Sequence, residues 1–318
     1  MRLPSYAYFE GKITPIDEAK ISVMTHALHF GTGAFAGIRA YWNEDEDQLY
    51  LFRPLDHFER FLNSAKLLCM EIDHTAESLL GITKNLLRTE CWRENVYIRP
   101  LVYAANTLLG GPRLYGLRAE VTIFSMPLAN YVPDEEGTHV TVSSWTRIDD
   151  NTIPARGKVT GGYVNSALAK NDALRAGFDE ALLLNRHGHI SEGAGENFFM
   201  VRDGLVVTPP TTDSILEGIT RRTVIELIRR ELGLEVVERS VDRSEVYLAE
   251  EAFLTGTAVQ VAAITRVDHR TIGTGKMGPV VSRLRELFFL AAQGRIETYR
   301  SWVIPVYEHA LDGYENPA

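Results

Sequence analysis

The segment Ile153-Pro-Ala-Arg-Gly-Lys158-Val-Thr-Gly-Gly-Tyr163 places one lysine between a proline and a pair of glycines. Glycines let the backbone approach a ligand closely and proline restricts the chain, so a short rigid segment aims the amine. Lysine is scarce here, with seven residues against 26 arginines, and few amines are available for covalent chemistry. Taken alone, Lys158 would more often be a solvated loop lysine. Other segments of the chain must decide between a solvated lysine and one used for covalent chemistry.

Three further segments favour a covalent role for this lysine. Ser191-Glu-Gly-Ala-Gly-Glu-Asn197 places two carboxylates among small residues, and an acid there could keep a ring nitrogen protonated. Leu216-Glu-Gly-Ile-Thr-Arg-Arg-Thr223 opens a predicted helix whose free N–H groups suit phosphate, with Thr220 expected as its N-cap. Thr255-Gly-Thr257 is a second hydroxyl-bearing turn. Each also has an ordinary alternative, an acidic turn or a simple helix cap.

Two other motifs suggest rival chemistry. Gly31-Thr-Gly-Ala-Phe-Ala36 matches a relaxed dinucleotide fingerprint, but the preceding residues indicate a helix or loop, whereas that fingerprint follows a strand. Lys276 lies in Gly273-Thr-Gly-Lys-Met-Gly278, which lacks P-loop spacing and is interpreted as a surface turn. Neither motif competes strongly with Lys158.

Composition limits the class of protein. The chain has 318 residues, 45% of them hydrophobic, and a formal net charge of −9 with both signs mixed along its length. It is long enough for two domains and has no basic stripe for nucleic acid. No run of about 18 apolar residues predicts a membrane span. Cys69 and Cys91 lack metal-type spacing, so we expect no disulfide or metal site and a cytoplasmic location.

The hydrophobic pattern alternates short strands with amphipathic helices and predicts an α/β (α+β) fold. Predicted strands include Val96–Ala104 and His139–Trp145, and predicted helices include Thr220–Leu232 and Val280–Ala292. A polar, turn-rich stretch suggests the domain boundary. We therefore expect a smaller N-terminal domain over 1–128, an interdomain loop over 129–137 and a larger cofactor-binding domain over 138–318.

Taken in order, these segments resemble the branched-chain amino acid aminotransferases of the fold type IV pyridoxal phosphate group. The resemblance covers nearly the whole chain. Besides the segments above, its motifs are His26-Ala-Leu-His-Phe-Gly31, Phe35-Ala-Gly-Ile-Arg39, the segment around Arg60, Tyr97-Ile-Arg-Pro-Leu101 and Ser143-Ser-Trp-x-Arg147. It implies a two-domain fold with pyridoxal 5'-phosphate at the domain interface and no metal.

The resemblance also implies residue roles. Lys158 would bind the cofactor as a Schiff base and act as the catalytic base and acid. Glu192 would pair with the pyridine nitrogen, and Tyr163 would hydrogen-bond the phenolic oxygen. Arg60, whose fork of donors suits phosphate, could otherwise form a helix pair with Asp56. The remaining implied cofactor residues are Leu216, Gly218, Ile219, Thr220 and Thr257.

For the substrate, the family places the α-carboxylate against the Thr257-Ala258 turn and Tyr97, and the γ-carboxylate of glutamate or 2-oxoglutarate against Arg99. The apolar pocket would be lined by Phe30, Phe35 and Tyr131. The chain departs from the common bacterial pattern in having Ala36 for a glutamate and Phe30 for a tyrosine. The loop 106–113, which in this family reaches the partner subunit's site, is also unusual.

The implied activity is reversible ping-pong transfer between leucine, isoleucine or valine and 2-oxoglutarate. A D-amino acid or (R)-amine aminotransferase or a related lyase is the alternative, and a catalytically silent binding protein is a third possibility. Because family active sites borrow loops from a neighbour, we expect a homodimer or a higher homo-oligomer with small-molecule substrates.

Overall fold

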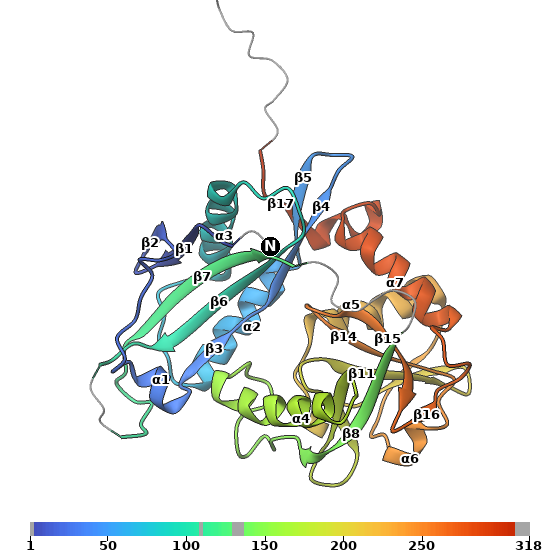
Figure 1. Cartoon of the computed structure of the whole chain (residues 1–318). Helices are drawn as coiled ribbons and strands as arrows, with labels where there is room; N and C mark the ends of the chain where they lie inside the picture. The colour runs from blue at the N-terminus through green and yellow to red at the C-terminus, as the bar shows by residue number, and fades with distance from the viewer. Residues whose placement is uncertain (1–2, 108–110, 129–136, 309–318) are drawn as a thin grey trace, which may run out of the picture.

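The computed structural model describes residues 3–107, 111–128 and 137–308 as two sheets with helices packed on them (Figure 1). The first sheet has the order β17-β5-β4-β6-β7-β1-β2, and β3 pairs with β6. All its pairings are antiparallel. Its strands are β1 (Tyr6–Phe9), β2 (Lys12–Pro15), β3 (Gly33–Phe35), β4 (Ile38–Asn43), β5 (Gln48–Phe52), β6 (Val96–Ala104), β7 (Ala119–Pro127) and β17 (Val303–Pro305).

Helices α2 (Pro54–Leu67) and α3 (Ala76–Glu90) cover one face of this sheet (Figure 1). Their buried apolar residues meet alternate residues of β6 such as Val96, Ile98 and Val102 in one core. The strongly apolar sequence of Val96–Ala104 predicted β6 with its observed bounds. The short α1 (His26–Phe30) precedes β3 and ends at Gly31.

The second sheet mixes parallel and antiparallel pairs in the order β10-β9-β8-β15-β14-β11-β12-β13, and a further β10–β11 pairing closes part of it on itself. Its strands are β8 (Thr138–Thr146), β9 (Glu180–Leu184), β10 (Ile190–Gly193), β11 (Asn197–Arg202), β12 (Leu205–Thr208), β13 (Val236–Glu238), β14 (Glu251–Gly256) and β15 (Gln260–Val267), with β16 (Arg270–Thr271) at the edge.

Helix α4 (Tyr163–Arg175) contacts β8 and β9, while α5 (Ile219–Leu227) and α7 (Pro279–Ala292) pack on β14. Shorter helical turns are η1 (Thr160–Gly162), η2 (Thr211–Asp213), η3 (Ile228–Leu232), α6 (Arg243–Val246) and η4 (Glu297–Trp302). One hydrophobic core joins the two sheets, since it contains Phe52 of β5, Phe253 of β14 and Phe288 of α7. The sheets thus share buried surface.

Three expectations need correction or qualification. Gly218, not Thr220, is the N-cap of α5, because its extended backbone precedes a helix that begins at Ile219. The predicted helix Thr220–Leu232 is α-helical only to Leu227 and continues as a single π-helical stretch to Gly233, whose φ of +63° ends it. The predicted interdomain loop lies outside the described residues except for Gly137. The strand β17 lies in the first sheet beside β5, although its residues fall within the range 138–318 expected for the second domain.

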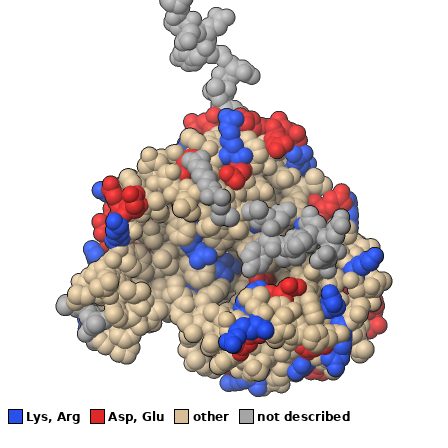
Figure 2. Space-filling view, viewed as in Figure 1, with Lys and Arg blue, Asp and Glu red and all other residues tan. Residues whose placement is uncertain are grey.

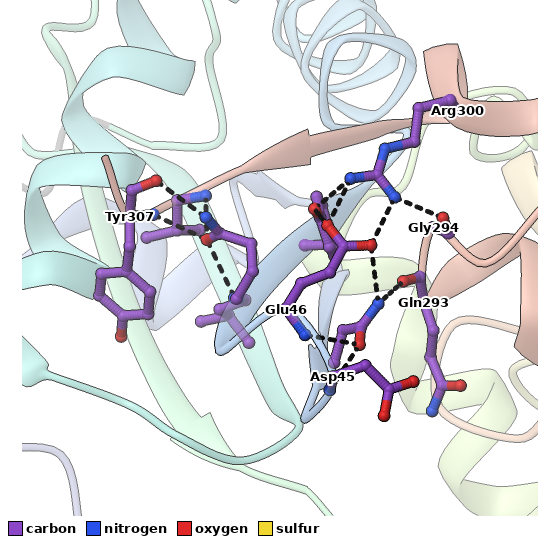
Figure 3. A network of polar contacts seen from close by, with 11 residues as sticks. Asp45, Glu46, Gln293, Gly294, Arg300 and Tyr307 are labelled. Carbon is purple, nitrogen blue, oxygen red and sulfur yellow. Dashed lines mark hydrogen bonds and ion pairs between the residues drawn. The ribbon is translucent and has the colours of Figure 1, made fainter. Parts of the chain in front are cut away.

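A polar network fixes the return of the C-terminal segment (Figure 3). The two terminal nitrogens of Arg300 lie 2.9 and 2.6 Å from the two carboxylate oxygens of Glu46. The Arg300 guanidinium also donates to the Gly294 carbonyl, and Asn43 Nδ2 donates to the Gln293 carbonyl at 2.9 Å. The turn between β4 and β5 is thereby tied to the end of α7.

Replacing Arg300 with methionine should lower the free energy of unfolding by about 1 kcal/mol, because a two-pronged pair is stronger than a single exposed one yet partly screened. Thermal denaturation should show a shift of roughly 2–4 °C. Arg283→Met is the control, since Arg283 pairs with Glu286 only within α7. Equal shifts for both variants would contradict a tie between the segments.

The described helices include none that is both long and apolar enough to cross a membrane. Acidic and basic side chains are interspersed over the face seen in Figure 2. Both cysteines are free and exposed.

Candidate active site

A cavity lies where the two sheets meet. Helix α2 of the first sheet contributes one wall, and the segment around Lys158, the β10–β11 turn, the start of α5 and the turn after β14 contribute the others. All the residues predicted to hold the cofactor line it: Arg60, Lys158, Tyr163, Glu192, Leu216, Gly218, Ile219, Thr220 and Thr257.

Hydrogen bonds hold the backbone N–H and the carbonyl of Lys158. Its backbone N–H donates to Ser64 Oγ of α2 at 3.1 Å, and its carbonyl accepts from the Phe35 N–H at 3.0 Å. Its Nζ lies 2.5 Å from Tyr163 Oη. Burial, assisted by the nearby Arg60 guanidinium, lowers the pKa of the Lys158 amine to about 8. A partly buried amine that gives up its proton this readily suits nucleophilic chemistry.

The glycines of the fingerprint-like motif have a structural role beside this lysine. Gly31 has a φ of +63°, and a Cβ there would lie 2.8 Å from Gly161 Cα. The Gly161 N–H donates to the Gly31 carbonyl at 3.1 Å. Because helix α1 rather than a strand precedes Gly31, the motif serves close packing against the lysine segment and is not a dinucleotide fingerprint.

Glu192 is buried on β10 with three donors around its carboxylate. Arg147 Nη2 lies 2.8 Å from Oε1, while Asn197 Nδ2 and the Leu216 N–H donate to Oε2 at 2.9 and 3.1 Å. Burial raises the pKa of Glu192, and Arg147 and the Leu216 N–H oppose that shift. Burial and then Glu192 raise the pKa of Tyr163 to about 12, which favours a neutral phenol.

The opposite end of the cavity collects donors for an anion. Arg60 Nη1 donates to the Glu217 carbonyl at 3.1 Å, directly before the N-terminus of α5. Asp56 pairs with Arg222 and Arg53, so the alternative of an Arg60–Asp56 helix pair is not found. Thr255 Oγ1 is buried without a hydrogen-bond partner among the described residues. A guanidinium, helix N–H groups and threonine hydroxyls together suit phosphate.

Gly218→Ala should weaken binding at this end of the cavity by about tenfold. The added Cβ would lie 2.1 Å from Asn197 Oδ1, so Asn197 would have to leave Glu192 Oε2 and the Leu216 carbonyl, at a cost of about 1–2 kcal/mol. Fluorescence titration of apoprotein with pyridoxal phosphate measures this. Gly195→Ala is the control, since Gly195 lines the same cavity with nothing near its Cβ. Equal affinity of both variants would refute the steric argument.

Three residues predicted for the substrate lie together beside Lys158. Arg99 donates to Tyr97 Oη at 2.9 Å through Nη2, and its guanidinium carbon lies 4.4 Å from the centre of the Phe35 ring. Lys158 Nζ is 5.1 Å from that same ring centre. Tyr97 can take this position because residue 37 is glycine: a Cβ there would lie 2.2 Å from Tyr97 Oη.

The turn predicted to hold the α-carboxylate is tied to the first sheet. Thr257 Oγ1 donates to the Gly37 carbonyl at 3.0 Å, and Arg39 Nη1 donates to the Ala258 carbonyl at 3.0 Å. The two sheets therefore assemble this side of the site jointly.

One residue predicted for the substrate, Phe30, lies away from the residues beside Lys158. Phe30 is 38% exposed and lines a separate apolar groove together with Phe9, Leu28 and Val164. Tyr131 lies outside the described residues, as do positions 108–110 of the loop over 106–113. Ser64, Arg147 and Asn197 contact Lys158 or Glu192 without having been predicted to do so. The last two lie in motifs quoted above, whereas Ser64 has no signal in the sequence.

These residues suit pyridoxal phosphate, the group that the resemblance implies. The cavity combines a readily deprotonated amine, a buried carboxylate for a ring nitrogen, a phenol and a donor-rich end with an unsatisfied buried hydroxyl. These groups match, in the same order, the aldehyde, pyridine nitrogen, phenolic oxygen and phosphate of that cofactor.

Comparisons with known proteins all identify aminotransferases. A model of class IV aminotransferases matches residues 33–267. The probable branched-chain-amino-acid aminotransferase of Aquifex aeolicus is 49% identical over 303 residues, covering 95% of this chain and 97% of that protein. The Escherichia coli K12 branched-chain-amino-acid aminotransferase is 37% identical, with 94% and 96% covered.

Solved structures agree. The branched-chain aminotransferase of the thermophilic archaeon Thermoproteus uzoniensis, solved with norvaline, superposes with a TM-score of 0.90 at 39% identity, covering 95% of this chain and 99% of that one. The pyridoxal phosphate form of the Thermobaculum terrenum enzyme gives 0.91 at 38% identity, with 96% and 99% covered. With the predicted order of motifs and the fold in agreement, this chain belongs to the class IV aminotransferase family.

Proposed function

We propose that this chain is a pyridoxal phosphate-dependent branched-chain amino acid aminotransferase, which transfers amino groups reversibly between leucine, isoleucine or valine and 2-oxoglutarate. The observation that carries the proposal is the convergence of Lys158, Glu192 and Arg60 on one cavity. The relatives named above, with this activity in their names, match almost the whole chain.

When bound, pyridoxal phosphate supplies an aldehyde for imine exchange and a ring that withdraws electrons from the substrate Cα. The Lys158 amine would hold the cofactor covalently between turnovers. Once released, its Nζ would take the proton from the substrate Cα as the general base and give it back as the general acid. The neighbouring Tyr163 hydroxyl, 2.5 Å away, orients that amine.

Substrate recognition would combine side chains of the first sheet with the turn after β14 of the second sheet. The Thr257-Ala258 turn and Tyr97 would bind the α-carboxylate common to all substrates. The Phe35 ring offers apolar surface to a branched side chain, whereas the Arg99 guanidinium lying against that ring could turn to a γ-carboxylate. One pocket would thus accept both classes of side chain.

Lys158 should react with the cofactor fastest above pH 8. Its pKa is lowered from 10.5 to about 8, so the neutral amine dominates above that pH. Its fraction falls about tenfold for each pH unit below. Stopped-flow absorbance after mixing apoprotein with pyridoxal phosphate, between about pH 6 and pH 9, measures this dependence. A rate that still rises steeply past pH 9 would show an unshifted amine.

A second copy of the chain would cover the groove that contains Phe30. Leu28 is 62% and Val164 64% exposed beside this groove, and exposed apolar patches of this kind mark association surfaces. We therefore propose a homodimer in which this face is shared, with Phe30 directed to the neighbouring copy. Sedimentation equilibrium should give at least twice the chain mass.

The exposed free cysteines fit a reducing compartment such as the cytoplasm.

Two measurements test the proposed function. Borohydride reduction of the cofactor-loaded protein followed by peptide mapping should label Lys158, and a label on Lys276 or none would reject the cofactor site. Initial rates with L-leucine, D-alanine and an (R)-arylalkylamine, each with 2-oxoglutarate, should be highest for L-leucine. A higher rate with either alternative donor would move the assignment to a D-amino acid or (R)-amine aminotransferase.

A further inference from the structure

Arg147 lines the cavity and pairs with Glu192. It follows β8, where its N–H donates to the Leu184 carbonyl at 2.8 Å. Its side chain is 14% exposed and lines the cavity beside Lys158 and Tyr163. Nη2 lies 2.8 Å from Glu192 Oε1, and Nε donates to the Ser214 carbonyl at 3.3 Å. The guanidinium is thus anchored on one edge and paired on the other.

The hydrogen bonds around Glu192 determine where a further donor can approach. A carboxylate has about four acceptor directions. Arg147 occupies one on Oε1, and Asn197 and the Leu216 N–H occupy two on Oε2. The remaining acceptor direction belongs to Oε1, the oxygen that Arg147 fixes. A ring N–H that approaches from the cavity would therefore meet the oxygen whose position and charge depend on Arg147.

Charge is the second consideration. A buried carboxylate without a cation takes up a proton, and a protonated Glu192 would no longer accept a hydrogen bond from a ring N–H. Lys158 and Arg60 act on Glu192 from greater distance, while Tyr163 and Glu196 lie on the same cavity wall. Among the described residues, Arg147 makes the ion pair with Glu192.

We propose that Arg147 is a positioning residue that keeps Glu192 ionised and aimed, and thereby keeps the cofactor's ring nitrogen protonated. This rests on the proposed cofactor role of Glu192. Arg147 does not need to touch the cofactor for this purpose, because it acts through the carboxylate. A purely structural alternative is that Arg147 only ties β8 to the segment around Ser214.

The ring nitrogen itself provides the test. Apoprotein reconstituted with pyridoxal phosphate labelled with ¹⁵N in the ring reports protonation directly through the ¹⁵N chemical shift. The wild type should show a protonated nitrogen. Arg147→Met and Arg147→Gln should both move the shift toward the unprotonated value, as Glu192→Gln should, whereas Arg147→Lys should retain the wild-type shift. Using two neutral variants guards against one failing to fold.

Arg186→Met is the matched control, since Arg186 pairs with Asp149 near the same loop but outside the cavity. It should leave the shift unchanged. Turnover gives an independent readout: Arg147→Met should lower kcat about a hundredfold, and combining it with Glu192→Gln should add less than about twofold to the loss of Glu192→Gln alone.

The outcomes separate the two proposals. Failure of the wild type to take up the labelled cofactor would reject the proposed function. If Glu192→Gln displaces the shift but neither neutral Arg147 variant does, only the role of Arg147 is rejected. Multiplicative losses of kcat in the double variant would likewise show that the two residues act independently.

Discussion

Replacing Lys158 with alanine should abolish covalent cofactor binding and lower kcat by at least about four orders of magnitude. Loss of a positioned general base alone costs about 10²–10⁴, and loss of the nucleophile adds to it. No other described lysine lines this cavity to substitute for it. Single-turnover kinetics with L-leucine, together with borohydride labelling, measure both effects.

Lys170→Ala is the matched control for this experiment. Lys170 is a partly buried lysine of the same sheet region, paired with Glu180 at 2.5 Å, but it does not line the cavity. That variant should retain its covalent label and turn over within about threefold of the wild type. A Lys158→Ala protein that still forms a borohydride-stable adduct elsewhere would contradict the assignment of this amine.

Much of this site could be predicted because its parts are local. The lysine segment, the Ser191–Asn197 turn and the start of α5 are each short runs in which glycines and polar residues have specific backbone functions. Their order along the chain then resembled one family. All the residues predicted for the cofactor accordingly line one cavity.

Contacts between distant segments were not predictable in the same way. Ser64 supports the Lys158 backbone from 94 residues away, and Arg147 reaches Glu192 through the register of β8, β9 and β10. No local pattern encodes such register. The pairing of β17 with β5 in the first sheet was also not predictable, because its three residues carry too little pattern to identify a partner strand.

The position of Phe30 was not predictable for a different reason. A family match assigns a residue to a pocket without showing where the backbone of this chain places it. Phe30 lies on the exposed groove, although the ring centre of Phe35, five residues later, is 5.1 Å from Lys158 Nζ. The turn at Gly31 separates the two, because its positive φ ends α1 before β3 begins.

Replacing Glu192 with glutamine should lower kcat about a hundredfold or more while the protein keeps its covalently bound, coloured cofactor. An amide cannot balance the charge of a protonated ring nitrogen, so the ring withdraws electrons less effectively when charge develops on the substrate. Lys158 is untouched by this change, which is why binding and colour should persist. Rapid-scan absorbance during the half-reaction with L-leucine measures the loss.

The control for this variant is Glu196→Gln, because Glu196 lines the same cavity from the same turn but has no ion pair with Arg147. Burial and Glu180 raise the pKa of Glu196, so its carboxyl takes up a proton more readily than a free one and an amide replaces it at little cost. We expect a loss of less than about fivefold there. If Glu196→Gln were the slower variant, the ring-nitrogen partner would be Glu196, and the Arg147–Glu192 pair would serve the structure of the β10–β11 turn instead.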